Sequence, residues 1–204
     1  MTAPHLKRLA DHFPLVLASG SPRRFELLTE MGVPFERIVP DLEEAREPGE
    51  GPYDYALRLA EDKALAVCSR TDNGAICIGS DTVVALGDDN LEKPVDENDA
   101  LRILSTLSGQ SHVVCTALAL ARSGEIVVSG YDTTKVMFNL VSEQQIRDYI
   151  KTGEPADKAG AYGIQGMGAF LVDRIEGNLD TVIGLPRNLL DSLARDALKK
   201  LQIG

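Results

Sequence analysis

Short apolar runs bounded by glycine, proline and acidic residues predict the strands of this chain. Leu15–Ala18 is a continuous apolar run of the kind that forms a buried strand. Two β-branched runs, 112–120 and 126–138, flank the turn-forming pair Ser123-Gly124 and therefore predict a hairpin. Further strands are expected over 75–79, 82–86, 169–172 and 181–183.

Apolar residues that recur every three to four positions predict helices between these strands. The longest such stripe runs from about Tyr53 to Val67. Three other helices begin at residues suited to N-capping, which are Ser21, Asp96 and Ser142. Each of these ends at a glycine, namely Gly32, Gly109 and Gly153. A final helix is expected over 187–201, whereas 33–51 is expected to be extended or irregular.

Because strands and helices are interspersed and one strand pair forms a hairpin, we expect an α/β fold with a mixed sheet flanked by helices. A length of 204 residues fits one domain, and the sequence contains no internal repeat. We therefore expect a single domain over 1–204, with a core at about 15–201.

The charge balance limits the partners of the chain. A formal net charge of -10 opposes approach to nucleic acid polymers and to anionic membranes, so neither is expected as a partner. No apolar run approaches the roughly 20 residues of a membrane span, and the first 14 residues lack the apolar core of a signal peptide. A cytoplasmic location is therefore expected. The three cysteines, Cys68, Cys77 and Cys115, lack metal-ligand spacing and are expected to be reduced and buried.

The first candidate for chemistry is the run Ser19-Gly20-Ser21-Pro22-Arg23-Arg24, between the first strand and the first predicted helix. A strand-turn-helix junction directs free backbone N–H groups and the positive end of a helix dipole at one point, which suits a phosphate. Arg23 and Arg24 add charge that the dipole disfavours unless an anion lies beside them. The run is equally compatible with a capped surface helix whose arginines are solvated.

Asp81 is the second candidate. Together with Ser80 it interrupts an apolar stretch from 75 to 86, where a buried carboxylate is costly without a cation, a metal or hydrogen-bond donors. We favour a functional Asp81 over a structural aspartate paired with a backbone group or a lysine.

Further candidates carry weaker signals. Lys63 and Lys93 are placed to donate to phosphate oxygens, and Glu43 and Glu44 could hold a hard cation, although solvated side chains are the commoner meaning of such residues. In the glycine-rich segment 160–168, missing side chains either let the backbone approach a flat ligand such as a base or simply permit turns. Lys158 precedes this segment and Gln165 lies within it.

Several common enzyme motifs are absent from the sequence. It contains no G-x-x-x-x-G-K-[ST] loop, no dinucleotide fingerprint and no G-x-S-x-G elbow. Its histidines, His5, His12 and His112, share no ligand spacing, so a zinc hydrolase lacks support.

Four segments in this order resemble the Maf family of nucleotide pyrophosphatases: Leu17–Arg24, Gly79–Thr82, Leu91–Pro94 and Lys158–Gly166. The likeness runs from about Leu15 to the last helix, and four motifs together are far more specific than any one of them. It implies an elongated mixed sheet whose two lobes enclose a nucleotide cleft, as in the inosine triphosphate pyrophosphatases. It also implies a homodimer.

The resemblance also implies roles for individual residues. Asp81 matches the proton acceptor of the family, and Ser19, Arg23, Arg24, Glu44, Lys63 and Lys93 match polar residues around the triphosphate. Glu44 and Asp81 are the expected ligands of a divalent cation, Mg²⁺ or Mn²⁺. Arg23, Thr82 and Gln165 are the expected determinants of base specificity.

Thr82 after the aspartate and Gln165 in Tyr-Gly-Ile-Gln-Gly resemble the subfamily that acts on dTTP and UTP, and modified pyrimidine nucleotides are further candidate substrates. The sister subfamily, similar to 7-methyl-GTP pyrophosphatase, has glutamine after the aspartate and a Glu-Gly ending. A third interpretation is a nucleotide-sensing regulator of septum formation, in which binding rather than hydrolysis carries the signal. The turn Asp88-Asp89-Asn90 is more acidic than the family pattern leads us to expect.

Overall fold

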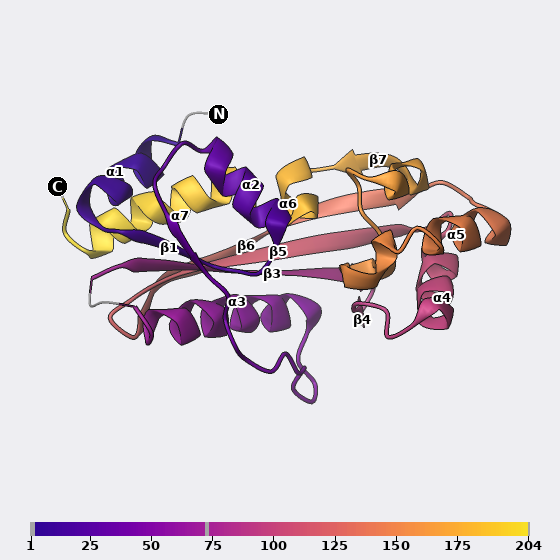
Figure 1. Cartoon of the computed structure of the whole chain (residues 1–204), viewed down its shortest axis with the longest axis horizontal. Coiled ribbons are helices and arrows are strands. Elements are labelled where there is room, and N and C mark those ends of the chain that lie inside the picture. The colour runs from indigo at the N-terminus through magenta and orange to yellow at the C-terminus, as the bar shows by residue number, and fades with distance from the viewer. Residues whose placement is uncertain (1–2, 72–73, 204) are drawn as a thin grey trace. The chain divides into compact units, whose positions relative to one another are not determined.

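The computed structural model describes residues 3–71 and 74–203. Within these ranges the strands form one mixed sheet of seven strands in the order β2-β1-β3-β5-β6-β7, with β4 paired to β3 (Figure 1). The sequence-based prediction of an α/β fold with a mixed sheet flanked by helices is confirmed. The chain divides into two compact units, and the strands that pass through both are β3 (Ile76–Leu86), β5 (Ser111–Arg122) and β6 (Glu125–Phe138).

Unit 1 comprises the described parts of 1–81, 116–132 and 184–204. Strand β1 (Leu15–Ala18) is parallel both to β2 (Glu36–Ile38) and to the first half of β3. The helices of unit 1 are α1 (Pro4–His12), α2 (Pro22–Glu30), α3 (Pro52–Cys68) and α7 (Arg187–Lys200). Figure 1 shows helix α3 on one face of this part of the sheet and helices α1, α2 and α7 on the other.

A glycine lets α3 lie directly on β3. A Cβ added to Gly79 would lie 2.8 Å from the backbone nitrogen of Ala64 and would also meet the carbonyl of Ala60. Only a residue without a side chain permits this approach. Gly79 is two residues before Asp81 on β3, and Lys63 directly precedes Ala64 on α3, so this contact determines how the lysine meets the aspartate.

Unit 2 comprises 82–115 and 133–183. Strand β4 (Asp89–Leu91) is antiparallel to the end of β3, and β7 (Val172–Glu176) is antiparallel to the end of β6. Its α-helices are α4 (Glu97–Leu107), α5 (Glu143–Ile150) and α6 (Leu179–Ile183). Its 3₁₀ turns are η1 (Glu154–Asp157), η2 (Ala159–Ala161) and η3 (Met167–Leu171). The core of this unit packs α4 and α5 against aromatic side chains that include Phe138, Tyr149 and Tyr162.

Most of the predicted caps and turns are confirmed. Ser21, Asp96 and Ser142 each accept a hydrogen bond from a backbone N–H of the first helical turn. Ser123 and Gly124 have φ values of 52° and 82°, as a tight hairpin turn requires.

Three sequence predictions about elements were wrong. The stretch 76–86 is one continuous strand, because the polar side chains of Ser80 and Asp81 find partners inside the fold. Residues 181–183 belong to a helix, α6, although their β-branched side chains favour a strand. The expected strand 169–172 is mostly a 3₁₀ turn, closed by a hydrogen bond from the Ala169 N–H to the Gly166 carbonyl, and pairing with β6 begins only at Val172.

Helix α1, the short strand β4 and the short strand β2 inside the segment expected to be extended or irregular had also not been predicted as such. No helix in the part of the chain that the structure describes is long and apolar enough to cross a membrane.

Candidate active site

The turn between β1 and α2 is held by its own side chains. The Ser21 N–H donates to the Ser19 hydroxyl at 3.1 Å, and the Arg24 N–H donates to the Ser21 hydroxyl at 3.5 Å. Arg37 on β2 donates to the Ser19 carbonyl at 2.9 Å and also to that of Gly20. Ser19 is buried. The turn at residues 19–24, which the sequence predicted to bind phosphate, is therefore a rigid, capped loop. Arg37 holds its backbone carbonyls, a contact that sequence patterns had not indicated.

Arg24 extends from this turn into the interior of unit 1. Its Nε donates to the Gly184 carbonyl at 2.9 Å and its Nη1 to the Ser80 carbonyl at 2.8 Å. The Ser80 hydroxyl donates to the same Gly184 carbonyl at 3.0 Å. Burial lowers the pKa of Arg24, and the negative charges of Asp81 and Glu44 oppose that shift. Arg24 thus ties the phosphate turn to β3, in addition to bringing a positive charge near Asp81.

Asp81 and Lys63 form a buried ion pair. Each residue is 6% exposed, and Lys63 Nζ lies 2.6 Å from Asp81 Oδ1. Lys63 Nζ also lies 2.7 Å from Glu44 Oε1, so one ammonium group joins two carboxylates. Burial raises the pKa of Asp81, and this effect outweighs the opposing charges of Lys63 and Arg24. A carboxyl with a raised pKa is a stronger proton acceptor than an ordinary aspartate.

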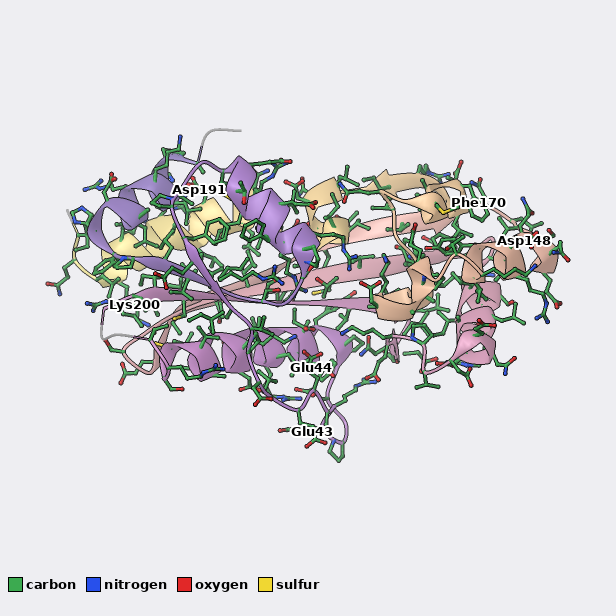
Figure 2. The ribbon with its side chains drawn as sticks, in the orientation of Figure 1. Glu43, Glu44, Asp148, Phe170, Asp191 and Lys200 are labelled. Atoms are coloured by element: carbon green, nitrogen blue, oxygen red, sulfur yellow. The ribbon has the colours of Figure 1, made fainter. Side chains whose placement is uncertain are left out.

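The two acidic residues of the loop between β2 and α3 differ in their surroundings. Figure 2 shows both Glu43 and Glu44 on this loop. Glu44 has a 40% exposed side chain and reaches Lys63, as described above. Glu43 is exposed. Of the acidic pair noted in the sequence, the structure therefore joins Glu44 to the Asp81 cluster.

Thr82, Lys93 and Gln165 lie in unit 2. Thr82 is half-buried, whereas Lys93 and Gln165 are exposed. The glycine-rich segment contacts the neighbour of Lys93, because the Gly160 N–H donates to the Glu92 carbonyl at 3.2 Å. Thus unit 1 brings Ser19, Arg24, Glu44, Lys63 and Asp81 together, with Arg23 adjacent to Arg24, and unit 2 carries the remaining three candidates.

Glycine is required at its positions in this segment for two different structural reasons. Gly160 has a φ of +68°, and a Cβ there would also lie 2.9 Å from Val84 Cγ2. Gly163, Gly166 and Gly168 are not among the described residues with positive φ. They are required instead by close packing, since an added Cβ would meet Glu154 or Tyr149. Turn conformation alone therefore explains Gly160 but not the glycines around Gln165.

Lys158, which precedes the segment in the sequence, is engaged locally. Its Nζ donates to the Glu154 carbonyl at 2.6 Å and to Asp157 Oδ1 at 2.7 Å. Glu154 itself had not been noted in the sequence, because a single glutamate after a glycine carries no pattern.

The described residues contain no group of three or more His, Cys, Asp or Glu side chains that could hold a metal ion. Two of the carboxylates predicted as ligands, Glu44 and Asp81, share Lys63 as a partner and are therefore close together. Two carboxylates suit Mg²⁺ or Mn²⁺ when phosphate oxygens and water complete the coordination. The donor set fits a substrate-borne cation rather than a protein cage.

Fold and site together define a class. This is an α/β protein in which arginine and lysine side chains surround one buried carboxylate beside a capped strand-to-helix turn, an arrangement suited to a phosphorylated ligand. A HAM1 protein from Coxiella burnetii has a similar fold, with a TM-score of 0.50 and 14% sequence identity over 90% of this chain and 99% of that one.

The chain belongs to the Maf family, since the family model described as Maf-like protein matches residues 14–197. A dTTP/UTP pyrophosphatase of Vibrio cholerae serotype O1 is 50% identical over 179 residues, which cover 88% of this chain and 95% of that protein. A dTTP/UTP pyrophosphatase of Escherichia coli O157:H7 is 48% identical over 172 residues, covering 84% and 87%. The resemblance inferred from the four motifs is thereby confirmed.

Proposed function

We propose that this chain is a nucleoside triphosphate pyrophosphatase that hydrolyses dTTP and UTP to the monophosphate and pyrophosphate. The relatives at 50% and 48% identity carry this activity in their names. The observation that carries the proposal is the buried Asp81, held by Lys63 at 2.6 Å in a cluster with Arg24. A proton acceptor and phosphate-binding cations are the two requirements of this reaction.

Asp81 acts as the general base. Water attacks the α-phosphorus of the nucleotide in line with the bond to the bridging oxygen, and the proton of the water passes to Asp81. The bond between the α-phosphorus and the bridging oxygen breaks, and pyrophosphate leaves with the bonding electron pair. Burial, which raises the pKa of Asp81, makes this proton transfer more favourable than with an exposed aspartate.

Cationic and hydroxyl groups hold the triphosphate. Ser19, Arg23, Arg24, Lys63 and Lys93 are the proposed phosphate-binding residues. Positive groups held in fixed positions stabilise the charge that develops on the leaving pyrophosphate, because they need no reorganisation during the reaction. The capped turn and the bonds of Arg24 to the Ser80 and Gly184 carbonyls provide such fixed positions in unit 1.

A divalent cation, Mg²⁺ or Mn²⁺, is the proposed cofactor, with Glu44 and Asp81 as its protein ligands. When bound, such a cation neutralises phosphate charge and orients the α-phosphate. Lys63, which contacts both carboxylates, limits the negative charge that would otherwise accumulate there.

Base selection is assigned to Arg23, Thr82 and Gln165. A primary amide offers one acceptor and two donors, which match the alternating edge of a uracil or thymine ring. Gln165 is exposed on the glycine-rich segment and is available for such contacts. A homodimer and a cytoplasmic location remain predictions from the family resemblance and the sequence.

The proposed function is tested by measuring pyrophosphate release from dTTP, UTP, 7-methyl-GTP and ATP, each with Mg²⁺. We expect release from dTTP and UTP at least about tenfold faster than from the two purine nucleotides, because one polar group left without its partner costs about 1–3 kcal/mol. Preferred release from 7-methyl-GTP would move the chain to the sister subfamily. Binding of dTTP without release from any nucleotide would contradict hydrolysis and favour a sensing role.

A further inference from the structure

The carboxylate of Glu154 accepts hydrogen bonds from two backbone N–H groups at the end of the glycine-rich segment and from the hydroxyl of Tyr149. Its Oε2 accepts from the Met167 N–H at 2.7 Å, and its Oε1 accepts from the Gly168 N–H at 3.2 Å. The Tyr149 hydroxyl donates to Oε1 at 2.9 Å. The same hydroxyl accepts from the Gly163 N–H at 3.1 Å. Glu154 and Tyr149 thus hold backbone groups both before and after Gln165.

The glycines of the segment allow this close approach. An added Cβ would lie 2.9 Å from Glu154 Oε1 at Gly163 and 2.6 Å from it at Gly166. At Gly168 it would lie 2.6 Å from the Tyr149 hydroxyl. These distances are too short for carbon, so a side chain at these positions would force either the segment or the Glu154 and Tyr149 side chains to shift.

Glu154 and Tyr149, the two residues that hold the segment, are themselves fixed by their contacts. Tyr149 is 3% exposed in the core of unit 2 and makes an edge-to-face contact with the Phe170 ring, which Figure 2 labels near α5. Lys158 donates to the Glu154 carbonyl and anchors the η1 turn that carries Glu154. Gln165, in contrast, is exposed. A rigid base therefore supports an exposed amide side chain, which is how proteins orient recognition groups.

The charge of Glu154 suits its task. Burial raises its pKa, but the Met167 and Gly168 amides and the Tyr149 hydroxyl together lower it, and the net shift is downward. Three donors thus face an ionised acceptor at neutral pH. Bonds of this charge-assisted kind are about twice as strong as neutral ones.

We propose that Glu154 is a positioning residue for nucleotide selection, whose carboxylate holds residues 163–168 in the conformation that presents Gln165 to a pyrimidine base. This inference rests on the proposed function, because it needs Gln165 to contact the base. It does not require Glu154 to touch the nucleotide.

The test is a double-mutant cycle in the full chain with Glu154→Gln, Gln165→Ala and the double variant. Replacing Glu154 by glutamine keeps the size of the side chain but puts an amide donor opposite backbone donors. We expect the KM for dTTP to rise about tenfold, as loss of one charge-assisted hydrogen bond implies, with kcat within about threefold of wild type. The preference for dTTP over ATP should fall by a similar factor.

Non-additive effects of Glu154→Gln and Gln165→Ala on KM would show that Glu154 acts through Gln165. If Glu154 acts through Gln165, adding Glu154→Gln to Gln165→Ala should change KM by less than about twofold. A full tenfold further rise in the double variant would overturn the proposal, as would an unchanged KM and preference in Glu154→Gln. Glu143→Gln, at an exposed carboxylate on α5 with side-chain exposure of 66%, is the matched control and should behave as wild type.

A milder variant covers the case in which Glu154→Gln does not fold. Tyr149→Phe removes only the hydroxyl that joins Glu154 to Gly163, and it should raise KM for dTTP in the same direction. Unchanged KM and preference in a folded Tyr149→Phe would then overturn the proposal. Wild-type protein that releases no pyrophosphate from any nucleotide would instead overturn the proposed function, so the two failures are distinct.

Discussion

At the scale of single residues, Asp81 and Lys63 depend on each other. Each is 6% exposed, and a charge buried to that degree without a partner costs several kcal/mol. Glu44, whose side chain is 40% exposed, gives Lys63 a second partner. This arrangement keeps a carboxylate inside the fold with a raised pKa, ready to accept a proton.

The raised pKa of Asp81 predicts the acid limb of the activity profile. A general base must be ionised, so kcat/KM for dTTP should fall as the pH drops through the pKa of Asp81. Because burial places that pKa above the ordinary value of 3.8, activity should be lost at a higher pH than an exposed aspartate would allow. Steady-state rates measured from pH 4 to 8, with circular dichroism to verify folding at each pH, provide the check. Full activity in folded protein down to pH 4 would contradict this account.

At the scale of elements, the contact between α3 and β3 determines the geometry of the ion pair. Gly79 is the feature that permits it, since its missing Cβ makes room for the backbone of Ala60 and Ala64. The sequence predicted both α3 and the strand residues around Asp81, but no sequence pattern indicated that the two backbones touch.

Gly79→Ala should therefore destabilise the protein by about 1–3 kcal/mol, the usual cost of forcing extra volume into a packed core. It should also lower kcat, because Lys63 moves relative to Asp81. Gly130→Ala, on β6, is the matched control, since its Cβ would meet only Leu193 and Leu189 side-chain carbons at 3.6 and 3.8 Å. Urea unfolding at pH 7 measures both variants. Equal stabilities for the two would show that the approach of α3 to β3 does not require glycine.

A second element-scale feature is the aromatic cluster of unit 2. His112 is 2% exposed, its Nε2 lies 2.8 Å from the Tyr162 hydroxyl, and its ring stands edge-on to Phe138 and Tyr162. Burial lowers its pKa from 6.5 to about 4. His112 is therefore neutral in the folded protein at pH values where the unfolded chain already binds a proton.

This shift predicts a loss of stability in mild acid. Between pH 6.5 and about 4 the unfolded state binds more protons at His112 than the folded state does, so the free energy of unfolding should fall as the pH drops through that window. The decrease attributable to His112 is on the order of 3 kcal/mol. Urea unfolding of wild type and His112→Gln at pH 7 and pH 4.5 measures this decrease. The free energy of unfolding should fall less in the variant than in the wild type between these pH values. Equal losses in both proteins would contradict a neutral buried His112.

At the scale of the whole molecule, the sequence predicted the α/β class, the caps, the hairpin and the family. These features depend on local patterns or on motifs. It could not predict that 76–86 is unbroken, because Lys63 and the Gly184 carbonyl pair with Asp81 and Ser80 inside the fold. The β-branched residues 181–183 likewise gave no sign of the helix that they form. Arg37 and Glu154 also escaped notice, since their importance lies in contacts with distant backbone groups.

The candidate site shows the same limit. Sequence reasoning selected Asp81, Lys63 and Glu44 separately, and the structure shows that Lys63 pairs with both carboxylates. The roles assigned to all of the site residues, Asp81 included, remain predictions. A chain with a net charge of -10 can bind a polyanionic nucleotide only through a local cationic cluster, and the surroundings of Asp81 provide one in unit 1.

The central claim is that Asp81 is the proton acceptor of a pyrophosphatase, and Asp81→Asn tests it most directly. Asp148→Asn, an exposed aspartate on α5 shown in Figure 2, is the control. Pyrophosphate release from dTTP with Mg²⁺ and binding of a non-hydrolysable α,β-methylene analogue are measured for both. We predict that Asp81→Asn loses about 100-fold or more in kcat, the usual contribution of a general base, while still binding the analogue. Asp148→Asn should match wild type. An Asp81→Asn protein that turns over dTTP at the wild-type rate would contradict the account.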